Sequence, residues 1–212
     1  MPDFSIERKY LEQGLKWIAG LDEAGRGSLF GPVVAAAVIL PPSWMKASPP
    51  PWLAGVDDSK RLRPAKRESL ARCLLQEAWS VGVGLASSRE VDRLNVHRAS
   101  LTAMKRATAG LGAPPDVLLV DGFALNDVHY LQERVKHGDQ KSLSIAAASI
   151  LAKVLRDRIL VSLDGMFEGW GLARHKGYGT LEHYRALARS GATPLHRQSF
   201  NLRSDAWIKR TR

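Results

Sequence analysis

The stretch WIAGLDEAGRGSLFGPVVAAAVIL, residues 17–40, decides the fold. Two apolar runs flank a glycine-rich turn that holds two adjacent acids, Asp22 and Glu23, and one arginine, Arg26. The second run, residues 33–40, is rich in valine and alanine, which is typical of a fully buried strand. Two neighbouring strands joined by a short glycine-rich turn predict a β-hairpin. The sequence therefore places charged groups between two buried strands.

The alternation of side chains along a strand predicts where the two acids point. If residues 15–22 form a strand, Gly20 and Asp22 share one face and Glu23 points to the other. Glu23 can join Asp22 only if the chain bends at Glu23, and the glycines that follow permit a bend. Gly20 is expected to leave space above the sheet on the face of Asp22. A bend at Glu23 is the geometric condition for a shared site.

The rest of the chain mixes strand and helix patterns. Residues 41–52 contain five prolines, which predicts an irregular surface loop. The segment SIAAASILA opens a long apolar pattern whose small residues suit a helix packed closely on a sheet, and Thr180 is a plausible N-cap. We predict a short amphipathic lead-in at 3–14, strands at 79–86 and 116–121, and helices at 65–78, 96–111, 144–163 and 181–191. This order indicates an α/β core with a small helical C-terminal unit.

Length and composition indicate one domain and a polyanionic partner. The 212 residues are 45% hydrophobic, and the single cysteine, Cys73, forms no internal disulfide. The longest purely apolar run has eight residues, whereas a membrane helix needs about 20, and the N-terminus has no apolar signal core. We expect a cytoplasmic protein without membrane association.

The net charge is +10, and residues 173–212 hold nine Lys or Arg against two acids. Such a segment suggests nucleic acid, and an ordinary basic surface is the equally weighted alternative.

Further acids follow apolar segments elsewhere in the chain. Asp121 ends the predicted strand 116–121, and Asp139 lies in a glycine-containing loop before the long helix. Each acid alone is ordinary turn or loop chemistry. Together with Asp22 and Glu23 they would repel one another unless cations held them, and oxygen ligands without cysteine favour Mg²⁺ or Mn²⁺ over zinc. Such sites serve phosphoryl chemistry, which indicates a nuclease if the strand ends converge.

Two rival interpretations account for parts of the sequence. The spacing of Gly25, Gly27 and Gly31 faintly resembles a dinucleotide-binding loop, but such a loop opens a helix and here an apolar strand follows. A metal-free ribonuclease would use a histidine pair, and the context of the six histidines marks none of them. We expect His175 and His196 to be phosphate contacts or solvated residues on the basic segment.

The quoted stretch resembles the signature of type 2 ribonuclease H, specifically bacterial ribonuclease HII. The resemblance extends from about residue 15 to residue 200, and further motifs follow in the order of the family. These are DDSKRL (57–62), LNVHRASLTAMKRATAGL (94–111), VLLVDG (117–122), GD before SIAAASILAKVLRD (144–157), HKGYGT (175–180) and HRQSF (196–200). The resemblance implies a ribonuclease H-like core with a mixed central sheet flanked by helices. We place the catalytic core at 1–172 and a basic, helical, substrate-binding segment at 173–212, in one structural unit with it.

The resemblance also implies an activity. The family cleaves RNA in RNA–DNA hybrids with metal ions and nicks 5′ to single ribonucleotides embedded in duplex DNA, as ribonucleotide excision repair requires. The products would carry 5′-phosphate and 3′-hydroxyl ends. A two-metal site with Mg²⁺ or Mn²⁺ would be held by the residues that match the family's acids: Asp22, Glu23, Asp121 and Asp139.

Substrate contacts follow from the same resemblance. The Gly-Arg-Gly element maps onto Gly25, Arg26 and Gly27, where the glycines would allow close approach and the arginine would donate to the 2′-hydroxyl. Tyr178 matches the substrate-sensing tyrosine, whose ring would lie against the next sugar. Candidate phosphate contacts, which position the duplex without reading its sequence, are Ser59, Lys60, Lys176 and Arg197.

Some features depart from the family pattern or leave alternatives. His137 stands where the family commonly has lysine, and the linker after Asp139 also differs. Asp157 is a competing acid, for which we favour an i,i+4 pair with Lys153. The alternative functions are a ribonuclease HIII-like hybrid nuclease, which typically has an extra N-terminal domain, and a non-catalytic duplex-binding protein on the same fold. We expect a monomer, and nothing in the sequence supports binding to a replication clamp.

Overall fold

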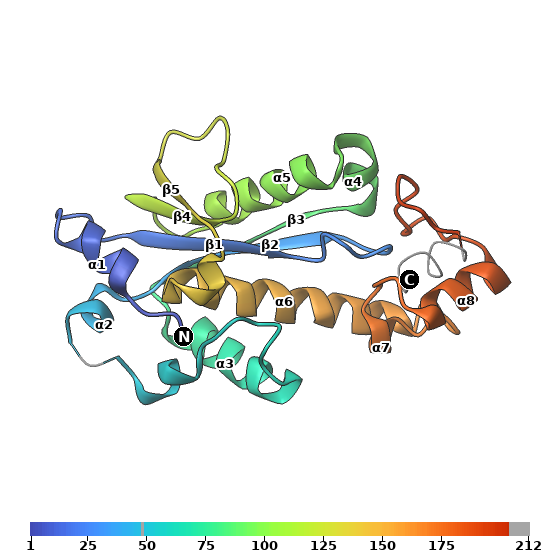
Figure 1. The fold of residues 1–212 in the computed structure, drawn as a ribbon, viewed down its shortest axis with the longest axis horizontal. Helices are drawn as coiled ribbons and strands as arrows, with labels where there is room; N and C mark the ends of the chain where they lie inside the picture. Colours follow the sequence, from blue (N-terminus) through green and yellow to red (C-terminus); the bar gives the residue numbers. More distant parts are fainter. Residues whose placement is uncertain (48, 204–212) are drawn as a thin grey trace.

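The chain folds into three layers, with a mixed sheet between two layers of helices (Figure 1). The computed structural model describes residues 1–47 and 49–203. Within them the sheet has the order β3-β2-β1-β4-β5, in which β1 pairs antiparallel with β2 and parallel with β4. The β1–β2 hairpin confirms the prediction. The strands are β1 (Ile18–Ala24), β2 (Val33–Ile39), β3 (Ser80–Ala86), β4 (Val117–Asp121) and β5 (Leu131–Val135).

The helices cover both faces of the sheet. The long helix α6 packs on β1 and β2 from one side, with α3 packed against α6, and α5 packs on β3 and β2 from the other side (Figure 1). The central strands are therefore buried on both faces, which explains their continuous apolar sequences. The helices are α1 (Ser5–Leu11), α2 (Pro42–Lys46), α3 (Pro64–Glu77), α4 (Ser88–Leu94), α5 (Val96–Ala109), α6 (Leu143–Asp164), α7 (Leu172–His175) and α8 (Leu181–Ser190).

Gly20 brings α6 close to the sheet. A Cβ atom at Gly20 would lie 2.1 Å from the carbonyl carbon of Ser144, in the first turn of α6. The predicted open space above Gly20 is therefore wrong, because the helix backbone fills it. The small residues at the start of α6 act in the same way, since Ala146, Ala147 and Ala148 are all fully buried. This contact fixes α6 beside the end of β1 that carries the acids.

Several local predictions need correction. β1 continues to Ala24 rather than ending at Asp22. The proline-rich segment 41–52 is not wholly irregular, because α2 and a 3₁₀-helix, η1 (Pro51–Gly55), form in and around it with proline at their first positions. The short helices α4 and α7, the strand β5 and the 3₁₀-helix η2 (Gly138–Gln140) were not predicted. β5 has the sequence LQERV at a sheet edge, where half-exposed side chains carry little hydrophobic pattern.

The C-terminal helices lie beyond the end of α6 (Figure 1). Phe30 and Leu160 pack there with Trp170 and Tyr184 in a cluster of their own. Thr180 caps α8 as predicted, since its hydroxyl accepts the backbone N–H of His183. The predicted segment 173–212 includes residues 204–212, with the tail KRTR, which lie outside the described residues. Across the part of the chain that is described, no helix has the length and apolar character to cross a membrane.

Candidate active site

The predicted acids of β1 and β4 meet in one cavity. The two strands are neighbours and run parallel, so their carboxyl ends lie at the same edge of the sheet. A cavity of about 640 Å³ opens there, with Asp22, Glu23 and Asp121 in its wall. The rest of the wall consists of Ala24, Gly25, Arg26, Gly27, Ser59, Lys60, Arg67, Ser149, Lys153 and Tyr178. The fold thus brings most of the predicted site residues to one place.

Glu23 reaches the cavity without the predicted bend. The strand is still paired at Ala24, opposite Val34, and the chain turns only at Gly25, whose φ is +95°. Pairing between β1 and β4 ends at Leu21, so the side chain of Glu23 stands beyond the paired part of β4. Its carboxylate accepts a hydrogen bond from Nη1 of Arg26 at 3.1 Å. The prediction of a bend at Glu23 is wrong, and the end of β4 provides the access instead.

Burial disfavours the charged forms of both acids of β1. Burial raises the pKa of Asp22 well above its ordinary value, and the charges of Glu23 and Asp121 raise it further. Burial also raises the pKa of Glu23, although the guanidinium of Arg26 acts in the opposite direction. Because the charged forms are disfavoured, a cation placed among these carboxylates would stabilise them.

Asp139 belongs to the same electrostatic cluster but does not line the cavity. It is 5% exposed and lies in η2, and the N–H of Gly138 donates to Oδ1 of Asp121 at 2.7 Å. Burial raises the pKa of Asp139, and the charges of Asp58 and Asp121 add to this effect. Asp58, which sequence reasoning missed, immediately precedes Ser59 in the DDSKRL motif.

Lys60 supplies positive charge to this cluster. Although burial works against it, the charges of Asp22 and Asp139 raise the pKa of the Lys60 ammonium. Within residues 1–47 and 49–203, no three or more histidine, cysteine, aspartate or glutamate side chains are arranged as a ready metal site. The donor chemistry nevertheless fits a hard divalent cation, since the clustered groups are carboxylates with unfavourable buried charge. Arg26 and Lys60 provide the positive charge in this arrangement.

Comparison with known proteins identifies the family of this chain. The family model described as Ribonuclease HII matches residues 19–203. The chain belongs to the ribonuclease HII family. Ribonuclease HII of Geobacter sulfurreducens is 47% identical over 197 residues, which cover 93% of this chain and 88% of that protein. For ribonuclease HII of Syntrophotalea carbinolica the identity is 50% over 195 residues, with 92% and 90% covered.

The fold agrees with a solved structure as well. The crystal structure of the ribonuclease H2 from Pyrococcus horikoshii superposes with a TM-score of 0.72 at 25% identity, covering 91% of this chain and 97% of that one. The predicted ribonuclease H-like fold is thereby confirmed. Membership of the ribonuclease HII family makes the chain a hydrolytic endonuclease, which sets aside the non-catalytic and ribonuclease HIII-like alternatives.

The two glycines of the family's Gly-Arg-Gly element have different surroundings. A Cβ atom at Gly25 would lie 1.9 Å from Nε of Arg156, whereas one at Gly27 would meet no atom within 4 Å. Gly25 is therefore required by the packing of Arg156, and not by an open approach as predicted. Gly27 is exposed and leaves its backbone accessible from the cavity side. Arg26, between them, holds its guanidinium 4.6 Å from the ring centre of Phe123.

The structure contradicts the predicted phosphate contact of Arg197. This side chain is fully buried, and its guanidinium donates to the carbonyl oxygens of Gly31, at 3.1 and 2.9 Å, and Arg26, at 2.8 Å. Its donors are occupied by backbone, so it cannot reach a phosphate. His175 and His196 are also buried, at 8% and 0% exposed, which overturns their assignment to the solvated basic surface.

The other predicted contacts lie at or near the cavity. Ser59 and Lys60 line it, and the Ser59 hydroxyl accepts from that of Ser149 at 2.9 Å. Tyr178 also lines it, with its ring centre 5.3 Å from Nζ of Lys153. Sequence reasoning missed Ser149 and Lys153. Their signal is a polar pair four residues apart in an otherwise small and apolar segment of α6, which places both on one helix face.

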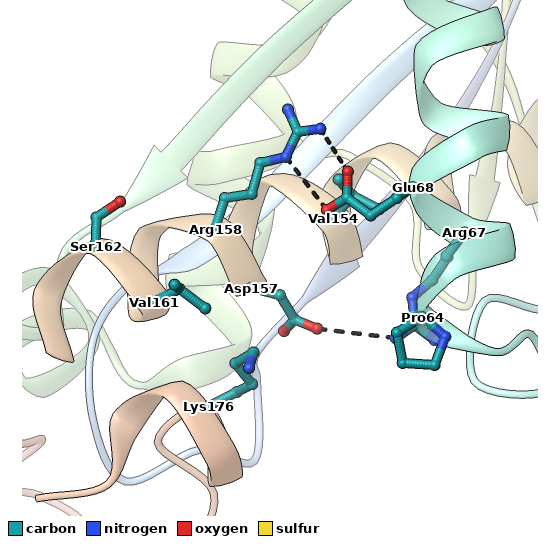
Figure 2. Close-up of a pocket in the computed structure, with 9 residues that line it drawn as sticks. All are labelled: Pro64, Arg67, Glu68, Val154, Asp157, Arg158, Val161, Ser162 and Lys176. Carbon is teal, nitrogen blue, oxygen red and sulfur yellow. Dashed lines mark hydrogen bonds and ion pairs between the residues drawn. The ribbon is translucent and has the colours of Figure 1, made fainter.

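A second pocket of about 460 Å³ adjoins this site between α3 and α6 (Figure 2). Lys176 lines it, and its ammonium donates to the carbonyl of Ala173. Asp157 lies here and not in the acid cavity, and its carboxylate accepts from Lys153 at 2.8 Å, which confirms the predicted i,i+4 pair. Arg158 donates twice to Glu68 across the same pocket (Figure 2). Asp157 is therefore held by its pair with Lys153, outside the acid cavity.

Proposed function

We propose that the enzyme hydrolyses RNA in RNA–DNA hybrids and nicks 5′ to single ribonucleotides embedded in duplex DNA. One observation carries the proposal: three clustered acids, an accessible glycine backbone at Gly27 and the ring of Tyr178 line a single cavity. A nuclease that distinguishes ribose from deoxyribose needs its sugar contacts beside its chemistry. Such an activity would serve ribonucleotide excision repair.

The acids would hold the metal ions that the reaction needs. Asp22, Glu23, Asp121 and Asp139 are the candidate ligands, for Mg²⁺ or Mn²⁺. Divalent ions bound there would acidify the attacking water and stabilise the leaving 3′-oxygen, giving 5′-phosphate and 3′-hydroxyl ends. Lys60, which the surrounding acids attract, lies where it can also pair with a backbone phosphate.

Sugar recognition would come from two neighbouring parts of the wall. The open backbone at Gly27 allows a ribose to approach, and Arg26 beside it can donate to a 2′-hydroxyl. The ring of Tyr178 offers a flat surface for the next sugar, where a deoxyribose fits because it lacks the hydroxyl that would clash. Together these two contacts would select an RNA-to-DNA step.

A DNA duplex with a single ribonucleotide tests the proposal. Incubation with Mg²⁺ or Mn²⁺ should give one nick, 5′ to the ribonucleotide, and an all-DNA duplex of the same sequence should stay intact. Cleavage of uniform hybrids alone would restrict the function to hybrids. Cleavage of the all-DNA duplex, or no cleavage of either ribonucleotide substrate, would overturn it. A monomeric state and a cytoplasmic location stay predictions.

A further inference from the structure

Two arginine side chains are buried without an acidic partner beneath the turn that follows β1. Arg156 and Arg197 are each 0% exposed. Among the residues that the structure describes, neither guanidinium lies within 4 Å of a carboxylate oxygen. Burial lowers the pKa of Arg197 to about 9, and the nearby charge of Arg156 adds to this effect. A buried charge without a counter-ion destabilises the folded state. The two buried arginines are therefore expected to have a role other than stabilising the fold.

The hydrogen bonds of Arg156 join two segments that are far apart in the sequence. We call residues 25–32, between β1 and β2, the recognition turn. Arg156 donates to the recognition turn three times: to the carbonyls of Pro32 at 3.0 Å and Phe30 at 3.1 Å, and to the hydroxyl of Ser28 at 2.6 Å. Its Nη1 donates to the carbonyl of Lys176 at 3.0 Å. One guanidinium therefore fixes the recognition turn to the loop that carries Tyr178.

Further contacts of Arg156 restrict both segments. Its Cζ lies 5.3 Å from the ring centre of Tyr178, on the loop that it binds. Gly25, in the recognition turn, has no room for a Cβ because the Arg156 side chain occupies that space. Ser28 and Tyr178 also pair directly through a short β-bridge. The spacing between the Gly-Arg-Gly backbone and Tyr178 therefore rests on the Arg156 side chain together with this bridge and the hydrogen bond from the N–H of Leu29 to the carbonyl of Gly177 at 2.8 Å.

We propose that Arg156 is a positioning residue for ribonucleotide selection. It holds the recognition turn and Tyr178 at the spacing of one RNA-to-DNA step, so that both sugar contacts are met only when the junction lies over the acids. The inference rests on the proposed function, which assigns the two contacts to successive sugars. The planar fork of arginine can serve acceptors in both segments at once, whereas the single ammonium of lysine cannot reproduce that geometry.

The variant Arg156→Lys keeps the charge and removes the fork. We expect kcat/KM on a duplex with one ribonucleotide to fall by about 10- to 100-fold, the scale of a misplacement of about 1 Å in an active site. A uniform RNA–DNA hybrid cannot satisfy the deoxyribose contact, so its cleavage should fall far less. The preference for the single-ribonucleotide substrate, which is the ratio of the two kcat/KM values, should therefore drop.

Two further variants keep this test decisive. Arg158→Lys is the matched control, because Arg158 lies two residues after Arg156 in α6, is exposed and pairs with Glu68. The substrate preference of this variant should equal that of the wild type. Ser28→Ala removes one acceptor of Arg156 and should lower the preference by a smaller factor even if Arg156→Lys does not fold. Circular dichroism melting verifies that each variant is folded.

The outcomes distinguish the positioning role of Arg156 from the proposed function of the enzyme. Equal losses on both substrates in folded Arg156→Lys, or an unchanged preference, would overturn the positioning role. The same conclusion applies if only Ser28→Ala folds and its preference is unchanged. A wild-type enzyme that fails to nick the single-ribonucleotide duplex would overturn the proposed function itself, and the inference with it.

Discussion

Asp22 is 6% exposed and lies beside Glu23 and Asp121, so its ionised form loses hydration and gains repulsion. The same burial gives Arg197 a structural role, because its donors bind backbone carbonyls. At the scale of single residues, the burial of a charged side chain and its hydrogen-bond partners therefore determine whether it takes part in catalysis or stabilises a loop. The sequence had suggested a phosphate contact for Arg197, because burial is not visible along the chain.

Replacing Asp22 by asparagine should separate activity from stability. Asp22→Asn should reduce cleavage by more than about 10²-fold, the scale of losing one electrostatic contribution in an active site, while hybrid binding persists. A raised native pKa makes stability fall as pH rises above the ordinary value near 3.8, so without divalent ions the variant should melt at a higher temperature than the wild type.

The gain in melting temperature of Asp22→Asn should grow as the pH increases. The exposed Asp127, whose φ of 55° asparagine tolerates, provides the control, since Asp127→Asn should change neither activity nor melting temperature. Near-normal turnover of Asp22→Asn in Mg²⁺ would contradict the assignment of the site.

At the scale of elements, glycines set how closely backbones approach one another. Gly20→Ala places a methyl group against the backbone of α6 and should destabilise the fold by about 3 kcal/mol, the upper range for overpacking. Gly27→Ala meets no atom of the protein, so its stability should change by less than about 0.5 kcal/mol while cleavage falls. Urea unfolding and nicking assays check both, and full activity of Gly27→Ala would contradict the close approach of the sugar.

The elements of the C-terminal unit are joined by a cluster of neutral histidines. Nδ1 of His183 faces the carbonyl of Tyr178 at 3.0 Å and must donate, so its Nε2 accepts from Nε2 of His196, also at 3.0 Å. Nδ1 of His196 accepts the N–H of Thr193 at 2.9 Å, which leaves its hydrogen on Nε2. Each hydrogen bond is satisfied only when both rings are uncharged.

This histidine pair should make the fold sensitive to acid. Burial lowers the pKa of both His183 and His196 to about 4, so between about pH 6.5 and 4 the unfolded chain binds more protons than the folded chain. Stability from the pair is present above pH 6.5 and is lost as the pH falls through this window, by up to about 1.4 kcal/mol per pH unit for each ring. His183→Gln should flatten this slope relative to the wild type in urea unfolding at pH 4.5 to 7. Parallel slopes would contradict the neutral pair.

At the scale of the whole molecule, the chain carries a net charge of +10, whereas its cavity is lined by acids. The basic surface is expected to bind the duplex backbone, and the acids to hold cations between the protein and the scissile phosphate. Such binding weakens steeply with salt, because phosphate contacts release counter-ions. The lysines and arginines contribute unequally, since some of them are buried.

Salt dependence should distinguish surface cations from buried ones. Lys60→Gln should lower the slope of log K against log salt by about 1 for hybrid binding, since Lys60 is exposed at the cavity. Arg197→Lys should leave the slope unchanged, because Arg197 is buried. Fluorescence anisotropy at several salt concentrations measures both. A changed slope for Arg197→Lys would place this side chain on the nucleic acid after all.

The sequence by itself determined the local patterns of this protein. Apolar runs, glycine turns and the Thr180 cap predicted the hairpin, α6 and α8, and the order of the motifs predicted the family. These features depend on neighbouring residues, whose spacing is visible along the chain. Asp22, Glu23 and Asp121 were recognised because each stands where an apolar run ends.

Only the tertiary structure decided which of these groups meet and which are buried. Parallel pairing of β1 with β4 brings together acids that are about a hundred residues apart in the sequence. Because this pairing ends at Leu21, the side chain of Glu23 reaches the cavity without a bend in β1. Because α6 packs against the turn after β1, the side chain of Arg156 leaves no room for a Cβ at residue 25, so only glycine fits there. The same helix places Ser149 and Lys153 in the cavity wall. Long-range pairing and burial depend on segments distant in the sequence, so spacing along the chain does not specify which residues come into contact.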